Sequence, residues 1–269
     1  MVIGGKTFDL QHKSYVMGIL NVTPDSFSDG GSFTELDAAL RQTERMLKEG
    51  AAIIDIGGES TRPGYTQISC EEEIGRVCPV IRAVKERFGV PVSLDTYKPE
   101  VAEAGILAGA DLINDIWGLK WEEDMASVIA KAGVPCCLMH NRADMDYGDF
   151  LEDVLSDLRE SLELAEKAGI GSEQILLDPG IGFAKSYEQN LILLKRLSEV
   201  CGLGYPVLLG TSRKSVIGNT LHLPVNERVE GTLTTTVMGR MAGCSVFRVH
   251  DVRANRRALD MADAILGTE

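Results

Sequence analysis

The sequence has no apolar run long enough to cross a membrane. A membrane-spanning helix needs about 18 consecutive apolar residues, and no stretch of the chain approaches that length. The first residues, MVIGGKTFDLQHKS, also lack the apolar segment of a secretory signal peptide. We therefore expect neither a membrane protein nor a secreted one.

Positive charge is in deficit. The chain carries 27 Lys and Arg residues against 40 Asp and Glu residues, a formal net charge of −13. So acidic a protein repels the phosphates of nucleic acids and the anionic surface of a membrane. The charge balance therefore argues against both of these partners.

Spacings typical of metal sites and nucleophiles are also missing. The six cysteines form no CxxC pair, and several lie in apolar, strand-like runs, so we expect buried free thiols in a reducing cytoplasm. No HxxxH or HxH spacing occurs among the four histidines, which argues against a zinc centre. Walker A, GxGxxG and GxSxG motifs are absent as well. A covalent nucleophile therefore has no support.

Short apolar segments alternate with helical patterns along the whole chain. Eight segments have the character of strands, and each is followed by a helix; the predicted helices span 36–49, 71–88, 99–108, 121–132, 149–168, 186–199, 226–242 and 251–266. Such alternation predicts a parallel α/β fold, and eight units in 269 residues predict a closed (β/α)8 TIM barrel. A doubly wound open sheet is the alternative. We interpret the segment with Phe8 and Leu10 as a short N-terminal hairpin or plug, and no linker divides the chain, so residues 1–269 are expected to form one domain.

Polar side chains stand where the predicted strands end. They are Asn21, Asp55, Asp95, Asn114, His140, Asp178, Arg213 with Lys214, and Arg248 with His250. The carboxyl ends of parallel strands share one edge, so these groups should face a common space. Two structural readings remain open: a strand-end Asp can cap the next helix, and Arg248 can simply pair with Asp251.

These groups suit different parts of a ligand. Three of them, Asp95, Asn114 and Asp178, together with Lys214, suit a flat heterocycle that carries N–H groups and a carbonyl, because a carboxylate accepts two N–H bonds from an amidine-like edge. By contrast, Arg248 and His250 with Asn21 suit a phosphate or pyrophosphate. The amide oxygen of Asn21 is also a ligand for a hard cation.

A second anionic subsite is expected at Arg62 and Ser215. Ser215 follows Lys214, where a helix N-terminus would direct backbone N–H groups at a carboxylate. The Gly- and Ser-rich loops 21–31 and 58–66 are expected to close over the site, although ordinary turn chemistry also accounts for the first of them.

Seven strings in order resemble the signatures of the dihydropteroate synthase family, pterin-binding enzymes of folate biosynthesis. The strings are MGILNVTPDSFSDGG at 17–31, DIGGESTRPG at 55–64, SLDT at 93–96, INDI at 113–116, DPGIGF at 178–183, GTSRKSVIG at 210–218 and RVHDV at 248–252. The resemblance covers nearly the whole chain. It implies a (β/α)8 barrel that joins 6-hydroxymethyl-7,8-dihydropterin pyrophosphate to p-aminobenzoate, releasing pyrophosphate and 7,8-dihydropteroate.

The resemblance also implies roles for individual residues. It places the pterin site at Asp55, Asp95, Asn114, Asp178, Phe183, Gly210 and Lys214, the pyrophosphate site at Asn21, Arg248 and His250 with Mg²⁺ on Asn21, and the p-aminobenzoate site at Thr61, Arg62, Pro63, Phe183, Lys214 and Ser215. It further implies that Asp95, Lys214, Asn21, Arg248 and His250 act in catalysis. The resemblance implies a family that is a sulfonamide target, and a cytoplasmic homodimer without a pterin pyrophosphokinase domain is expected.

One segment departs from the family pattern. After the fifth strand the chain reads MHNRADMDYGDF, which is shorter than the loop expected there and leaves His140 and Asn141 without a role. Two other functions remain as alternatives: a pterin-binding methyltransferase of the corrinoid type and a pterin binder without turnover. Neither needs a pyrophosphate site, so the SRK and RVHD strings argue against both.

Overall fold

Eight parallel strands form the centre of the molecule. The computed structural model describes residues 1–23, 32–60 and 67–268, with only the backbone for residues 32–34. The sheet order is β8-β7-β6-β5-β4-β3-β10-β9. The strands are β3 (Tyr15–Asn21), β4 (Ile53–Gly57), β5 (Val92–Asp95), β6 (Leu112–Asp115), β7 (Cys136–Met139), β8 (Ile175–Asp178), β9 (Leu208–Leu209) and β10 (Val246–Val249).

The two ends of this order meet. A parallel bridge joins Leu177 of β8 to Val207, and the Leu177 N–H donates to the carbonyl of Pro206 over 2.9 Å. The sheet thus closes on itself as a TIM barrel, which confirms the predicted fold. The open doubly wound alternative was wrong.

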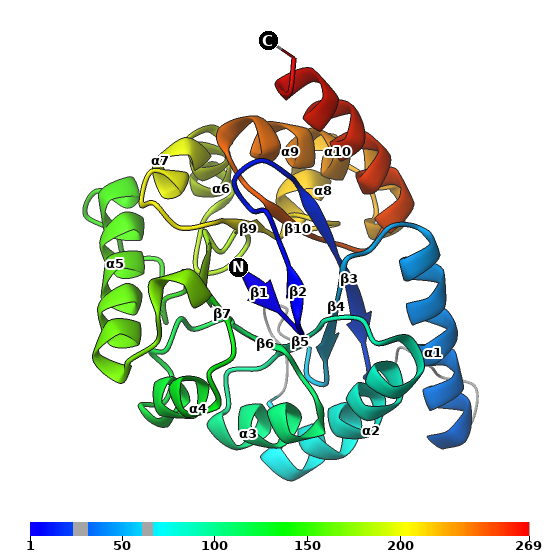
Figure 1. Cartoon of the computed structure of the whole chain (residues 1–269). Coiled ribbons are helices and arrows are strands. Elements are labelled where there is room, and N and C mark those ends of the chain that lie inside the picture. The colour runs from blue at the N-terminus through cyan, green and yellow to red at the C-terminus, as the bar shows by residue number, and fades with distance from the viewer. Residues whose placement is uncertain (24–31, 61–66, 269) are drawn as a thin grey trace.

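Helices surround the barrel (Figure 1). They are α1 (Ser32–Lys48), α2 (Cys70–Phe88), α3 (Pro99–Ala108), α4 (Asp124–Ala132), α5 (Phe150–Ala168), α6 (Tyr187–Lys195), α7 (Leu197–Cys201), α8 (Ser215–Leu221), α9 (Val229–Ala242) and α10 (Val252–Leu266). The α3 helix ends at Gly109, whose φ of 113° favours glycine, as the sequence predicts.

Two helical predictions need correction. The helix expected at 186–199 is divided into α6 and α7, because Arg196 has φ −111° and ψ 21°, outside the helical region. The second error is an omission, since α8 lies between β9 and α9. Its seven residues contain Gly218 and are too few for a helical period to stand out.

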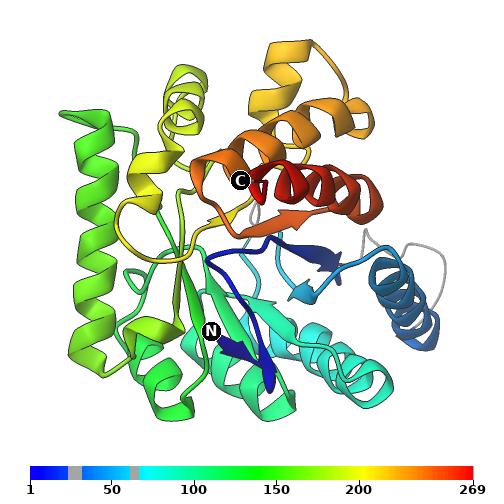
Figure 2. The same ribbon diagram turned by 45° about the horizontal axis from the view of Figure 1, so that its top comes forward.

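The N-terminal hairpin covers one end of the barrel, as predicted. Its strands β1 (Val2–Ile3) and β2 (Lys6–Thr7) are antiparallel. The buried side chains of Ile3, Phe8 and Leu10 pack against a layer from the early positions of the barrel strands, composed of Met17, Ile53, Leu112, Cys137, Leu176, Leu208 and Val246. Figures 1 and 2 show the hairpin across this barrel end. The other end is left for the polar residues.

Strand periodicity explains why the polar residues lie at the same height along the barrel axis. Side chains two positions apart on a strand point to the same face. Two residues beyond Ile53, Leu112 and Leu176 of the apolar layer stand Asp55, Asn114 and Asp178. The barrel interior is therefore apolar at its amino end and polar at its carboxyl end.

The cysteines behave as predicted. All six are free thiols, four of them buried and two, Cys70 and Cys201, half-buried. Among the described residues, no helix combines the length and the apolar character that a membrane span requires.

Candidate active site

Arg248 of β10 lies between two carboxylates inside the barrel. Its Nε donates to Asp55 Oδ2 and its Nη2 to Asp95 Oδ2, each over 2.6 Å. The other oxygen of Asp55 accepts a 2.6 Å hydrogen bond from the hydroxyl of Ser93. The Arg248–Asp251 pairing considered from the sequence was wrong, since Asp251 pairs instead with Arg213 at 2.6 Å.

Asp95 carries an unused polar atom. Its Oδ1 is buried and has no hydrogen-bond partner among the residues that the structure describes. Burial raises the pKa of Asp95, with Asp55 adding to the rise and the Arg248 charge opposing it. Buried polar atoms are almost always paired in folded proteins, so this oxygen marks the place of a ligand group.

Lys214 and Asp178 both lie near Gly210. A Cβ added at Gly210 would lie 3.7 Å from Asp178 Oδ2 and 3.8 Å from Lys214 Nζ. Burial lowers the pKa of Lys214 to about 8, and Asp178 opposes that shift. Burial likewise raises the pKa of Asp178, while Lys214 opposes the rise. The two groups therefore stabilise each other's charge at the edge of the Asp95 pocket.

The segment after β8 forms an apolar wall of this pocket. The ring centroid of Phe183 is 4.8 Å from Lys214 Nζ, and the same ammonium donates to the carbonyl of Ile181. Phe183 and Trp117 pack against a small buried cluster of Tyr97, Ile116 and Met139. The role of Phe183 as an apolar wall of a ligand site stays a prediction.

The remaining predicted residues lie around the barrel mouth. Asn21 ends β3, half-buried, beside Gly57 of β4. His250 follows β10, and its Nδ1 is 3.0 Å from the hydroxyl oxygen of Ser212. That oxygen also accepts the His250 backbone N–H over 3.1 Å, so Ser212 holds both the backbone and the ring of His250.

Several predictions stay untested by the geometry. Ser215 is exposed and begins α8, as expected, but Thr61, Arg62 and Pro63 lie outside the described residues, as do most of the two loops expected to close. Within the described part of the chain, no group of three or more His, Cys, Asp or Glu side chains is arranged to hold a metal.

Sequence reasoning missed a buried ion cluster at β4 and β5. Lys98 Nζ lies 2.8 Å from Glu59 Oε2 and 2.8 Å from Glu73 Oε2. Its third hydrogen bond goes to the carbonyl of Ile68, and Glu59 accepts the Ile68 N–H. Because lysines and glutamates are usually exposed, only their place next to strand ends could have pointed to this cluster.

His140 and Lys185 form a second buried group that the sequence left without a role. Lys185 Nζ is 2.7 Å from His140 Nδ1, and His140 Nε2 is 2.9 Å from Asp157 Oδ2. Burial lowers the pKa of His140 to about 4, with Asp157 opposing, so the imidazole is neutral. Burial also lowers the pKa of Lys185 to about 7, against the opposing charge of Asp178.

Comparison with known proteins shows which family the chain resembles. The family model described as "Pterin binding enzyme" matches residues 17–250. The chain is 58% identical to the dihydropteroate synthase of Clostridium beijerinckii over 267 residues, which is 99% of each chain. Among solved structures, the dihydropteroate synthase of Clostridium difficile in the presence of pteroic acid has a TM-score of 0.95 and 49% identity, over 97% of this chain and 100% of that one.

A further structure was determined with a substrate-sized ligand. The Xanthomonas albilineans dihydropteroate synthase with 4-aminobenzoic acid has a TM-score of 0.94 and 42% identity, over 99% of this chain and 98% of that one. A family match over most of the chain and this degree of identity leave no room for a chance likeness. The chain therefore belongs to the pterin-binding enzymes and, within them, to the dihydropteroate synthases.

Proposed function

We propose that the chain condenses 6-hydroxymethyl-7,8-dihydropterin pyrophosphate with p-aminobenzoate to form 7,8-dihydropteroate and pyrophosphate. The observation that carries this proposal is the buried, unpartnered Oδ1 of Asp95, in a pocket that also contains Asp178 and Lys214. Similar proteins hold pteroic acid and 4-aminobenzoic acid in their structures, which supports the same substrate classes here.

The pterin ring binds among the strand-end residues. Asp95 Oδ1 and Asp178 accept N–H groups of the heterocycle, Asn114 offers both a donor and an acceptor, and Lys214 donates to a ring acceptor. Each of these side chains is supplied by a different strand or strand-end loop. A rigid barrel therefore presents them in fixed positions, so little binding free energy is lost in ordering the site.

The pyrophosphate leaves on the side of Asn21, Arg248 and His250. Two nitrogens of Arg248 are held by Asp55 and Asp95, while its Nη1 has no acceptor among the described residues and is available for a phosphate oxygen. The imidazole of His250, held by Ser212, is the second group that we assign to the departing anion.

Asn21 is the protein ligand that we assign to Mg²⁺. An ion of this type usually keeps several waters and takes phosphate oxygens beside one or two protein oxygens, so a single amide oxygen suffices. When bound, Mg²⁺ would neutralise charge on the pyrophosphate. Asp95 stabilises the electron-poor pterin left after C–O cleavage, and the aniline nitrogen then attacks.

p-Aminobenzoate binds against Phe183, Lys214 and Ser215, together with Thr61, Arg62 and Pro63. The Phe183 ring supplies an apolar face for the aromatic ring, and the Lys214 ammonium beside it supplies positive charge for the carboxylate.

We also propose that the chain forms a homodimer in the cytoplasm. Large apolar side chains are exposed along α6, α8, α9 and α10, namely Leu191, Ile192, Leu221, Met238, Met241, Met261, Ile265 and Leu266. Exposed apolar patches of this kind mark protein interfaces, and the six free thiols fit a reducing compartment. Light scattering at micromolar concentration should give twice the monomer mass; a monomer mass would contradict the dimer.

Chromatography of reaction mixtures tests the proposed reaction. Purified protein with dihydropterin pyrophosphate, Mg²⁺ and p-aminobenzoate should form dihydropteroate. Pterin binding without any condensation product would contradict the proposal and favour the methyltransferase or the binding protein, of which only the former would demethylate methyltetrahydrofolate in the presence of a corrinoid partner.

A further inference from the structure

The segment Gly180–Phe183 positions Lys214. It contributes the Ile181 carbonyl, which accepts a hydrogen bond from Lys214 Nζ, and the Phe183 ring, which lies 4.8 Å from the same nitrogen. The segment is short and turns sharply, with φ values of 69° at Gly180 and 85° at Gly182. Such a turn has no strand or helix ladder to hold it, so other contacts must fix its shape.

Two backbone N–H groups of the turn donate to Gly180 O and Asn190 Oδ1, and Lys185 supplies the charged contacts. Its buried ammonium lies 2.9 Å from the Gly180 carbonyl, 3.0 Å from the Phe183 carbonyl and 2.7 Å from His140 Nδ1. A lysine ammonium has three N–H donors, and here each one has its own acceptor. Lys185 thus joins both ends of the turn that holds Lys214.

His140 orients this ammonium from the neighbouring strand. Because the imidazole is neutral and its Nδ1 faces a donor, its proton lies on Nε2 and is donated to Asp157 over 2.9 Å. The same carboxylate of Asp157 accepts hydrogen bonds from the guanidinium of Arg142. A chain of hydrogen bonds therefore runs from α5 through β7 to the turn.

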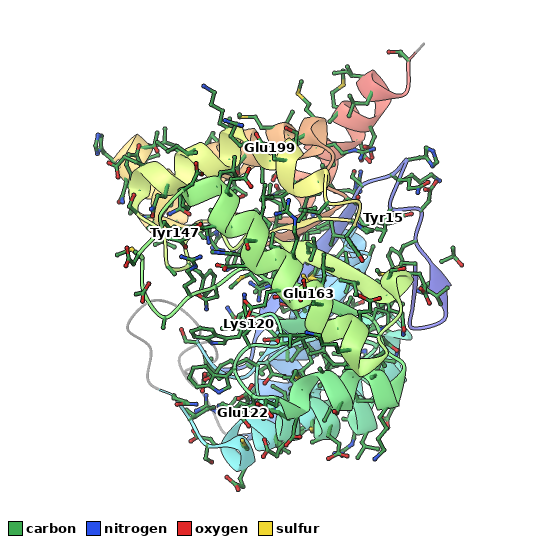
Figure 3. The ribbon with its side chains drawn as sticks, turned by 90° about the vertical axis from the view of Figure 1, so that its left-hand side faces the viewer. Tyr15, Lys120, Glu122, Tyr147, Glu163 and Glu199 are labelled. Atoms are coloured by element: carbon green, nitrogen blue, oxygen red, sulfur yellow. The ribbon has the colours of Figure 1, made fainter. Side chains whose placement is uncertain are left out.

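The short loop after β7 also contacts the chain next to this turn. Tyr147 donates its hydroxyl hydrogen to the carbonyl of Ala184 over 2.8 Å, and Arg142 lies over the Tyr147 ring at 4.4 Å. Figure 3 views the molecule from the side on which Tyr147 and Lys120 lie beside α5. The loop 140–149, which departs from the expected family pattern, therefore contacts the chain next to the turn after β8.

We propose that Lys185, oriented by His140, is a positioning residue that locks the Gly180–Phe183 turn and thereby sets Phe183 and Lys214 for both substrates. The expected change in KM rests on the proposed function, whereas the expected change in the shape of the turn does not. Lys185 makes no hydrogen bond to Asp95, Asp178 or Lys214 in the described contacts, so its hydrogen bonds act on Lys214 through the turn, beside the direct charge interaction with Asp178.

The test compares Lys185→Met with Lys120→Met. The control lysine donates to the Asp157 backbone carbonyl over 3.1 Å and lies 3.8 Å from Glu160, but it does not contact the turn. Lys185→Met should raise the KM of both substrates by roughly 10- to 100-fold, the usual cost of losing hydrogen bonds from a charged donor. Amide exchange in the peptide 179–186 should rise by a similar factor. Lys120→Met should change neither quantity.

A second pair of variants separates positioning from simple destabilisation. His140→Asn keeps an acceptor, through Oδ1, where Nδ1 of the imidazole stands, whereas His140→Leu keeps none. We expect His140→Asn to retain KM values near those of the unaltered protein and His140→Leu to resemble Lys185→Met. A smaller folded fraction would lower kcat at constant KM instead. If Lys185→Met does not fold, the comparison of His140→Asn with His140→Leu still tests whether Lys185 positions the turn.

The outcomes distinguish the inference from the proposed function. Unchanged KM values and unchanged exchange in Lys185→Met, or equal effects in Lys120→Met, would overturn the positioning role while leaving the reaction intact. If the unaltered protein makes no dihydropteroate, the proposed function fails, and the exchange comparison alone still confirms or overturns the lock on the turn.

Discussion

The Nη2 group of Arg248 lies 2.6 Å from Oδ2 of Asp95, linking β10 to β5 across the barrel interior. Arg248 was expected to serve an anion and Asp95 a heterocycle, as members of two separate groups. Their contact joins the two proposed subsites, so charge on an anion bound at Arg248 would be felt at the Asp95 carboxylate.

Asp95→Asn tests the pterin carboxylate. The variant keeps the shape of the side chain but loses the charge that pairs with Arg248, and an NH2 group replaces one of the two carboxylate oxygens. We expect kcat/KM for the pterin substrate to fall by roughly 100-fold or more. Steady-state kinetics with the pterin varied would measure this, and a loss below about threefold would mean that Asp95 does not bind the pterin.

Gly210→Ala tests where the pterin lies. The added methyl group would stand in ordinary contact with Asp178 and Lys214, 3.7 and 3.8 Å away, so the fold should tolerate it. It would nevertheless occupy space next to the ring, and we expect the pterin KM to rise about tenfold at an unchanged melting temperature. Gly75→Ala is the control, because a Cβ there meets nothing within 4 Å. Equal KM values in the two variants would place the ring elsewhere.

The pH dependence of the reaction should report Lys214. Burial lowers the pKa of its ammonium to about 8, so the charged donor is present below that pH and is lost as the pH rises through it. We expect kcat/KM to decline about tenfold per pH unit above 8, in addition to the earlier decline as Lys185, with a pKa of about 7, loses its charge. Lys214→Met should have low activity throughout and lack the later decline. A profile that stays flat to pH 10 in the unaltered protein would exclude an ammonium role for Lys214.

The carboxyl-edge placement of Asp55, Asp95, Asn114 and Asp178 followed from the sequence alone. Strand periodicity and the parallel order determine which edge a strand-end side chain reaches, and both are local properties. The Arg248 contacts depend on barrel closure, which brings Arg248 next to Asp55 and Asp95, 193 and 153 positions away in the chain. No local pattern predicts such contacts. Buried Lys98 and Lys185 escaped notice because a lysine has no local signal for burial.

Lys98→Met tests the buried ion cluster. Removing the ammonium leaves the carboxylates of Glu59 and Glu73 buried without their shared partner, and burial already raises the pKa of Glu73. We expect the free energy of unfolding, measured in urea, to fall by about 3 to 5 kcal/mol. Lys48→Met removes an exposed lysine paired with Glu44 and should change it by less than about 0.5 kcal/mol. Similar values for the two variants would contradict the structural role of Lys98.

Removal of Mg²⁺ separates the leaving-group site from the pterin pocket. With a chelator present, we expect dihydropteroate formation to stop and to return on addition of excess Mg²⁺, while binding of a pterin that lacks the pyrophosphate is unchanged. Asn21→Ala should raise the Mg²⁺ concentration needed for half-maximal rate. Full activity in the chelator would exclude a magnesium requirement.

The most direct test of the account is the stoichiometry of pyrophosphate release and dihydropteroate formation in one reaction mixture, with and without p-aminobenzoate. The account predicts one pyrophosphate for each dihydropteroate when p-aminobenzoate is present, at a rate that collapses in Lys214→Ala. Tight pterin binding with neither product formed, or dihydropteroate formation unaffected by Lys214→Ala, would contradict it.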